Sequence, residues 1–337
     1  MKVGTFGYSH SRGLGHLTLD FYKNGIITDV LVVEHPSIPV QPWYPDAPRT
    51  QAGRLNYDLL RDFCKGKDAM LFFETPFYWP VFDYCREIGV RTYLCTMYEC
   101  TPIVRPFHPH KYLCPSLLDV DYFQFHPHEL VQLPVDSRVR WRLREKAEHF
   151  VHNGGYLGMR GKDGVMREGT ETVIRAMQYV KSPIQLTIRV QENVSQELQG
   201  ICGTDARITY VPENVEYGDL YGVGDVAVGA QKWNGCSLPL QEAYASGLLV
   251  INTDRYPMNT WLPPEPLVRA DRKIENSSIG GPYMKFTECC IDPIVLAAKM
   301  DEWYGRDCAN YSLAGKAWAY TNSWELLRPV WKELLSK

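Results

Sequence analysis

Stretches rich in apolar β-forming residues alternate along the chain with segments in which apolar residues recur at helical spacing. This alternation predicts parallel strands covered by helices, which is an α/β architecture. We expect strands at residues 2–7, 29–33, 69–74, 91–96, 149–153, 185–190, 207–211, 226–229 and 248–252. We expect helices at residues 16–23, 54–64, 81–88, 170–180, 239–246 and 293–304, and a last helical stretch at 313–335.

The expected strands form two groups, separated by Leu133-Pro-Val-Asp136 and the basic run that follows it. Each group has the strand–helix order of a Rossmann-like unit, and 337 residues are enough for two cores. We therefore predict one domain over residues 1–134 and a second over residues 135–312. Ligands of open α/β sheets bind beyond the carboxyl ends of the strands, so function is expected in the loops that follow them.

Composition narrows the classes of function. The net charge of −3 provides no global basic field for nucleic acid, although a local basic patch is compatible with it. The ten cysteines are scattered without a C-x-x-C pair, and no apolar run reaches the roughly 18 residues of a membrane span. Because the first residues also lack the apolar run of a signal peptide, we expect a cytoplasmic protein without a membrane segment.

One segment carries the strongest functional signal, because it follows an expected strand and opens an expected helix. It reads Asn234-Gly-Cys-Ser-Leu-Pro-Leu-Gln-Glu-Ala-Tyr-Ala-Ser-Gly247. This segment resembles glycosyltransferase family 4 and related retaining enzymes of the GT-B type, whose pattern here is E-G-F-G-L-x-x-L-E-A-M-A-x-G. The second glutamate of that pattern matches Glu242, and its first position falls on Asn234. The resemblance implies the GT-B fold, with two Rossmann-like domains facing across a cleft.

The resemblance also implies roles for these residues. In the family the second glutamate binds the ribose hydroxyls of the donor, and a carboxylate suits this task because it accepts two hydrogen bonds. The first position lies near the donor sugar, where Asn234 can hydrogen-bond a hydroxyl but cannot carry charge. We assign Asn234 to catalysis, and Glu242, Ser237 and Leu238 to donor binding. The alternative for Glu242 is a solvated helix residue.

A glycine-rich loop, Gly154–Gly169, resembles the first loop of the family's C-terminal domain. In the family an arginine and a later lysine of this loop hold the donor diphosphate. The arginine matches Arg160, but the lysine position reads Glu168. The second cation is therefore Lys162 or Arg167, of which we prefer Arg167.

Two further segments follow the family order. Residues 210–221 resemble the loop that contacts the nucleobase, and we assign Val211 to the donor site. Leu130–Asp136 resembles the linker between the domains. In GT-B proteins a C-terminal helix crosses back to the first domain, and we expect this of residues 313–337.

The first strand ends in a loop with Gly13 and Gly15, which matches a glycine-rich loop that approaches donor phosphate and acceptor in the family. His10 or His16 could face the cleft there, and we assign His16 to catalysis, the alternative being a helix residue without a ligand. Glu99 follows another strand, and we assign it to acceptor activation, as a base or as an orienting acceptor. The alternative for Glu99 is a helix cap or an ion pair with Arg105, and the next candidates for the base are His10, His16 and Glu74.

Three other signals are discounted. Asp119-Val-Asp121 matches a metal-binding D-x-D motif, but this tripeptide is common by chance. Phe107-His-Pro-His110 and Phe125-His-Pro-His128 lack a partner at metal-ligand spacing, and we interpret them as exposed loops. The basic run from Arg138 to Lys146 is interpreted as a solvated face.

These observations lead to three hypotheses. The first is a glycosyltransferase that uses a nucleotide-sugar, with a UDP-sugar favoured, no required cofactor or metal, and retention of configuration. Its acceptor is unknown, and a hydroxymethylated base in DNA is the specific guess, because compact phage GT-B enzymes of this kind exist and the basic run could contact phosphates. The second is a non-catalytic GT-B-like protein that binds nucleotide-sugars or glycans. The third is an epimerase or a phosphorylase, although Lys232 has no context for pyridoxal phosphate.

Overall fold

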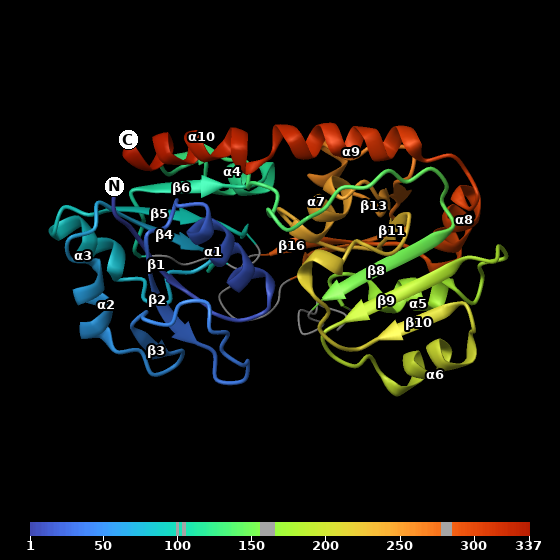
Figure 1. The fold of residues 1–337 in the computed structure, drawn as a ribbon, viewed down its shortest axis with the longest axis horizontal. Helices are drawn as coiled ribbons and strands as arrows, with labels where there is room; N and C mark the ends of the chain where they lie inside the picture. The colour runs from blue at the N-terminus through green and yellow to red at the C-terminus, as the bar shows by residue number, and fades with distance from the viewer. Residues whose placement is uncertain (99–100, 103–105, 156–165, 278–284) are drawn as a thin grey trace. The chain divides into compact units, whose positions relative to one another are not determined.

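The computed structural model describes residues 1–98, 101–102, 106–155, 166–277 and 285–337 (Figure 1). Glu99, Arg160 and Lys162 of the expected site lie outside these residues. The contacts between residues divide the chain into two compact units. The first unit contains Met1–Asp136 and Ser323–Lys337, and the second extends from Ser137 to Asn322.

A sheet of seven parallel strands, in the order β3-β2-β1-β4-β5-β6-β7, forms the centre of the first unit (Figure 1). Its central strands β1 and β4 are buried along their whole length, which explains why Thr5 is the one polar residue in these two strands. The strands are β1 (Val3–Gly7), β2 (Asp29–Glu34), β3 (Arg49–Gln51), β4 (Ala69–Phe73), β5 (Arg91–Cys95), β6 (Lys111–Cys114) and β7 (His128–Leu130). The helices are α1 (Gly13–Lys23), α2 (Tyr57–Cys64), α3 (Val81–Glu87), α4 (Leu117–Phe123) and α10 (Trp324–Ser336).

The helix α10 is attached to the first unit by its tryptophans. Trp331 donates a hydrogen bond to the carbonyl oxygen of Gln132 at 3.1 Å, and Trp324 donates one to Asp20. Both indoles meet the ring of Phe21 edge-on, with centroids 4.8 and 4.9 Å away. These tryptophans are buried packing residues.

A second parallel sheet, in the order β10-β9-β8-β11-β12, forms the centre of the second unit. Two small pairs accompany it, β13 with β14 in parallel and β15 with β16 antiparallel. The strands are β8 (His149–Gly155), β9 (Gln185–Val190), β10 (Ile208–Val211), β11 (Val226–Val228), β12 (Leu249–Ile251), β13 (Thr253–Asp254), β14 (Val268–Arg269), β15 (Arg272–Ser277) and β16 (Phe286–Cys290). The helices are α5 (Thr170–Ala176), α6 (Gln196–Thr204), α7 (Leu238–Ala245), α8 (Pro293–Trp303), α9 (Ala309–Thr321) and the 3-10 turns η2 (Tyr217–Asp219) and η3 (Met258–Thr260).

Every strand expected from the sequence is present, with its ends within two residues of the expected ones. The last helical stretch differs, because two helices, α9 and α10, replace the single helix expected from residue 313 to residue 335. The two helices belong to different units, so each one packs on its own neighbours. Within the second unit, Gly315 of α9 lies so close to the backbone of α7 that a Cβ atom would come within 2.2 Å of the Tyr244 carbonyl oxygen.

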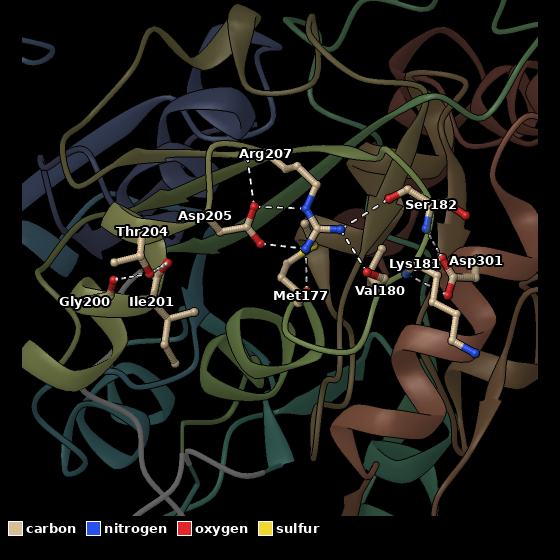
Figure 2. Close-up of polar contacts among 10 residues, drawn as sticks. All are labelled: Met177, Val180, Lys181, Ser182, Gly200, Ile201, Thr204, Asp205, Arg207 and Asp301. Carbon is tan, nitrogen blue, oxygen red and sulfur yellow. Dashed lines mark hydrogen bonds and ion pairs between the residues drawn. The ribbon is translucent and has the colours of Figure 1, made fainter.

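The amino end of the second sheet is held by structural ion pairs and caps (Figure 2). Arg207 precedes β10, pairs with Asp205 at 2.7 Å, and donates to the carbonyl oxygens of Met177 and Val180 after α5. Asp301 of α8 accepts hydrogen bonds from the backbone N–H groups of residues 181 and 182. This end of the sheet is therefore occupied by contacts that satisfy helix termini, and the opposite end is where a ligand site is expected.

Candidate functional site

Both sheets reverse their strand order at one point, between β1 and β4 in the first unit and between β8 and β11 in the second. In such sheets the loops after the two strands diverge at the carboxyl end and leave a crevice in which ligands bind. In the second unit these loops carry Arg167 and the segment Asn234–Gly247. In the first unit they carry the loop from Tyr8 to Gly13 and the residues after β4.

Glu242 lies on α7 with its carboxylate almost fully buried. Its Oε2 accepts a hydrogen bond from the hydroxyl of Tyr221 at 2.9 Å, and its Oε1 accepts one from the hydroxyl of Tyr217. The alternative of a solvated helix residue is therefore wrong for Glu242, because its carboxylate is oriented by two tyrosines. Neither partner was predicted from the sequence, although both lie in the segment assigned to base contacts.

The turn before α7 is held by Asn234 and Ser237. Asn234 Oδ1 accepts a hydrogen bond from the backbone N–H of Ser237 at 2.8 Å, and Ser237 has the left-handed φ of 51°. Glycine occupies that position in the family pattern, which fits this backbone conformation. The side-chain oxygen of Asn234 thus serves the turn, and its NH2 group is what remains to contact a sugar hydroxyl.

A buried network connects the loop before α5 with the start of α7. Arg167 Nε donates to Glu168 Oε1 at 2.8 Å, and the Gln231 amide donates to Glu168 Oε2 at 2.6 Å. The same amide contacts Ser237 Oγ at 2.9 Å. Glu168 therefore replaces the family's lysine with a carboxylate that holds Arg167 and Gln231 in place. Gln231 was not expected from the sequence.

Lys232 is buried and forms an ion pair with Glu171 in the first turn of α5. A Schiff base with pyridoxal phosphate needs a lysine whose amine can lose its proton and reach the cofactor. The contact with Glu171 occupies this amine inside the protein. The structure thus gives no support to a phosphorylase that would use Lys232.

A cavity of about 30 Å³ lies beneath α7 and is lined by polar groups of His152, Asn153 and Asn252. Asn153 Oδ1 and Asn252 Nδ2 are buried and have no hydrogen-bond partner within the described part of the chain. This volume has room for one water molecule, and it is far too small for a nucleotide. A ligand of nucleotide size would therefore have to bind outside this cavity.

His152 beside the cavity makes the stability of the fold sensitive to acid. Its Nδ1 hydrogen-bonds the Val228 carbonyl oxygen and its Nε2 the Thr170 hydroxyl, and burial lowers its pKa below the ordinary value. Below about pH 6.5 the unfolded chain then binds a proton that the folded chain does not, so the free energy of unfolding should fall as the pH decreases. Urea unfolding should give a lower free energy of unfolding at pH 5.5 than at pH 7.5. In His152→Gln the difference in the free energy of unfolding between the two pH values should be smaller. An equal pH dependence in the variant would contradict the assignment.

The loop after β1 in the first unit is organised around His10. Its Nδ1 accepts a hydrogen bond from the Arg12 backbone N–H at 3.3 Å, so the neutral imidazole carries its proton on Nε2. Burial and the nearby charge of Arg12 lower the pKa of His10 and favour this neutral form. In this form Nε2 can donate a hydrogen bond to a ligand but cannot accept a proton, so His10 suits an orienting role rather than that of a base.

His16, assigned to catalysis from the sequence, lies in α1. Its ring is 5.1 Å from the ring of Trp43, which belongs to the proline-rich loop of residues 35–48 between β2 and β3. The same loop is attached to the loop after β1 by Ser9, whose hydroxyl donates to the Gln41 carbonyl oxygen at 2.8 Å. After β4, Glu74 and Phe77 have positive φ values of 60° and 59°. Strained backbone of this kind clusters at functional sites, and here it lies beside the strand-order reversal.

The two glycines expected to approach a ligand, Gly13 and Gly15, lie in the first turn of α1 and differ in what surrounds them. A Cβ atom on Gly15 would lie 2.1 Å from the His10 carbonyl oxygen, whereas one on Gly13 would meet no protein atom within 4 Å. Gly15→Ala should therefore destabilise the fold by about 1–3 kcal/mol through overpacking, and Gly13→Ala should change stability by less than about 0.5 kcal/mol. Urea unfolding of the two variants measures both. A stable Gly15→Ala protein would show that the loop adapts, and lost ligand binding in Gly13→Ala alone would indicate close approach of a ligand.

Two of the signals discounted from the sequence have structural explanations. Ser116 caps α4, because its hydroxyl oxygen accepts a hydrogen bond from the Asp119 backbone N–H, and the hydroxyl donates to the Asp119 carboxylate, so Asp119 of the D-x-D match belongs to a helix cap. The rings of His108 and His126 stack at 4.3 Å, and no group of three or more metal-ligating residues occurs in the described part of the chain.

The interpretation of the basic run as a solvated face is wrong for Arg144. Its side chain is buried, and its guanidinium donates to four backbone carbonyl groups, those of Tyr221, Gly224, Arg142 and Ser246. Arg138 also has a defined place, with its guanidinium 4.0 Å from the centre of the Tyr217 ring. Arg140, Arg142 and Lys146 are exposed, and Arg144 and Arg138 are not, so the run does not form one continuous patch of exposed cations.

The structure brings part of the expected donor site together in the second unit. Asn234, Ser237, Leu238 and Glu242 gather at α7, and Arg167 is joined to them through Glu168 and Gln231. Val211 ends β10, the edge strand, two strands away from β8. No helix in the described residues is long and apolar enough to cross a membrane.

Comparisons with known proteins bear on the fold. No protein-family model matches the sequence, and no curated protein is significantly similar to it. Among solved structures, HepE from Anabaena in complex with UDP-glucose is similar with a TM-score of 0.67 and 10% identity, over 100% of this chain and 99% of that one. A glycosyltransferase from Rickettsia africae has a TM-score of 0.67 and 11% identity, over 99% of this chain and 98% of its own. Sucrose-phosphate synthase from Thermosynechococcus elongatus has a TM-score of 0.63 and 13% identity, over 100% of both chains.

These similarities cover whole chains, so they concern both units and not a single common domain. The chain therefore has the GT-B fold, an α/β architecture of two Rossmann-like units.

Proposed function

We propose that this protein is a glycosyltransferase that moves a sugar from a nucleotide-sugar, with a UDP-sugar favoured, to an acceptor hydroxyl. The observation that supports this most is the buried, oriented carboxylate of Glu242 at the carboxyl end of the second sheet. The shared fold with HepE, which was solved with UDP and with UDP-glucose, agrees with a nucleotide-sugar donor.

In this proposal each group at the second unit has one task. Glu242 accepts hydrogen bonds from the ribose hydroxyls, and Arg167, with Arg160 as the other expected cation, neutralises the diphosphate. The NH2 group of Asn234 holds a sugar hydroxyl. Transfer proceeds with retention, as the resemblance to family 4 implies, and the departing diphosphate takes the acceptor proton while Glu99 orients the acceptor. No metal is required in this scheme, because the arginines supply the positive charge.

The acceptor is proposed to bind in the first unit, and a hydroxymethylated base in DNA, as in compact phage enzymes, remains the specific candidate. Arg144 cannot contribute to phosphate contacts because it is buried. Arg140, Arg142 and Lys146 are the exposed cations of the run that could make such contacts. We also propose a cytoplasmic location, because the cysteines of the described residues are all free thiols.

The alternative is a GT-B-like protein that binds a nucleotide-sugar without transferring the sugar, and the pairing of Arg167 with Glu168 favours it. Release of UDP from UDP-glucose, measured with and without acceptors, separates the two functions. An enzyme releases UDP faster when an acceptor is present, whereas a binding protein shows affinity but no turnover. The assay should be repeated with other nucleotide-sugars and with hydroxymethylated duplex DNA, and NMR of the product then gives the anomeric configuration.

A further inference from the structure

The two tyrosines that bind Glu242 are held very differently. Tyr221 is buried, and its hydroxyl lies 3.1 Å from the Pro239 carbonyl oxygen as well as 2.9 Å from Glu242 Oε2. Its backbone carbonyl oxygen is also fixed, because Arg144 donates to it at 2.7 Å. Tyr221 is therefore a permanent partner that orients the carboxylate.

Tyr217 is half-buried and lies on η2, a 3-10 turn of three residues. Its hydroxyl donates to Glu242 Oε1, and its ring contacts the guanidinium of Arg138 through a cation–π interaction. A short 3-10 turn on the surface has few backbone hydrogen bonds to break when it shifts. Tyr217 can therefore leave Glu242 at much lower cost than Tyr221.

A ribose diol needs the same carboxylate oxygens. Each oxygen of Glu242 already accepts from one tyrosine, and because Tyr221 is fixed, the oxygen on which a ligand hydroxyl can replace a protein donor is Oε1, where the Tyr217 hydroxyl donates. Two donors that compete for one acceptor exclude each other in part, and the energy of the bond to Tyr217 is subtracted from the binding of the ligand. The contact therefore lowers affinity for any ligand that presents a diol.

We propose that Tyr217 is an affinity-determining residue that occupies the place of a ligand hydroxyl on Glu242 and is displaced when the nucleotide binds. This inference rests on the proposed function, because it takes the ligand to be a ribonucleotide. Arg138 stabilises the ligand-free position through the Tyr217 ring, since it lies over the ring face and leaves the hydroxyl directed at Glu242.

The experiment compares UDP with its 2′,3′-dideoxy analogue by calorimetry on the full chain. Tyr217→Phe keeps the ring and its contact with Arg138 but removes the competing hydroxyl, so UDP should bind about three- to tenfold more tightly, the effect of one ordinary hydrogen bond. The analogue without the diol should gain nothing. Tyr311→Phe is the matched control, because the carboxylate near the Tyr311 hydroxyl is a different one, that of Glu265, in the same unit. Its affinity for UDP should equal that of the unaltered protein.

The outcomes separate the inference from the function on which it rests. If the unaltered protein binds UDP and Tyr217→Phe binds it equally or more weakly, the displacement of Tyr217 is refuted and the proposed function stands. An equal gain with UDP and with the dideoxy analogue also refutes it, because the gain would not depend on the diol. If the folded, unaltered protein binds no nucleotide in a panel that includes UDP, both the function and the inference fail. A second variant, Arg138→Gln, should shift the affinity for UDP in the same direction as Tyr217→Phe.

Discussion

Glu242→Gln should weaken the binding of UDP by about 1.5–3 kcal/mol, the range for hydrogen bonds to a charged group. The glutamine keeps the size of the side chain and one oxygen, so Tyr221 can still donate to it. It loses the negative charge and offers an NH2 group where the ribose hydroxyls need an acceptor. Calorimetric titration of UDP into the purified variant measures the change.

The matched control is Glu148→Gln, because Glu148 is exposed and lies just before β8 at the opposite end of the sheet. Its affinity for UDP should not change. Urea unfolding of Glu242→Gln must show a folded protein, since Glu242 is buried with two tyrosines. Unchanged affinity in a folded variant would remove Glu242 from the donor site and with it the main support for the proposed function.

Glu242 was singled out because its segment resembles the pattern of glycosyltransferase family 4. The physical reading of the sequence contributed the setting of that segment, since parallel strands buried on both faces read as continuous apolar stretches and the segment from Asn234 to Gly247 comes between β11 and β12. The order of the strands in such a sheet then determines which loops lie next to each other at its carboxyl end. The short outer strands β3, β6 and β7 were not expected, because strands of so few residues carry little periodicity.

The partners of Glu242 could not be predicted in this way. Tyr217 and Tyr221 lie in one segment, but nothing in their spacing shows that both hydroxyls point at a carboxylate more than twenty residues later. Glu168 is a similar case. Its sequence position indicated a lost cation, and only the structure shows that it organises Arg167 and Gln231. Such side-chain networks depend on tertiary packing, which local patterns do not record.

The burial of the charged side chain of Arg144 could not be predicted from local sequence patterns either. An arginine in a run of alternating cations is usually exposed, because burying a charge is costly. Here four backbone carbonyl groups replace water around the guanidinium, one of them from Ser246 at the carboxyl end of α7. Negative partial charge gathers at that helix end and stabilises a cation. Burial lowers the pKa of Arg144 to about 10, so the side chain stays charged at neutral pH.

We expect Arg144→Met to lower the free energy of unfolding by about 2–4 kcal/mol. Methionine fills much of the same space but cannot donate, so the buried carbonyl group of Tyr221 loses its Arg144 donor, at a cost of about 1–3 kcal/mol for a buried group left unsatisfied. The carbonyl groups of Gly224, Arg142 and Ser246 each lose one of two donors, because they also accept from Arg142 Nη2, the Ser312 hydroxyl and the Arg142 backbone N–H. The substitution also removes the desolvation penalty of the buried charge, and this offsets part of the lost stability. Arg144→Lys should lower the free energy of unfolding by less, because an ammonium can donate to some of these oxygens. It should still be less stable than the unaltered protein, because lysine lacks the planar guanidinium fork.

Urea unfolding of Arg144→Met beside Arg140→Met tests this account, because Arg140 is an exposed arginine of the same run. The Arg140 variant should change stability by less than about 0.5 kcal/mol. Since Arg144 also fixes the backbone of Tyr221, the Arg144 variant should bind UDP more weakly than the Arg140 variant. Equal stability of the two variants would show that the carbonyl groups find water or other partners. It would also mean that Arg144 does not hold the segment from Tyr221 to Gly224 against the end of α7.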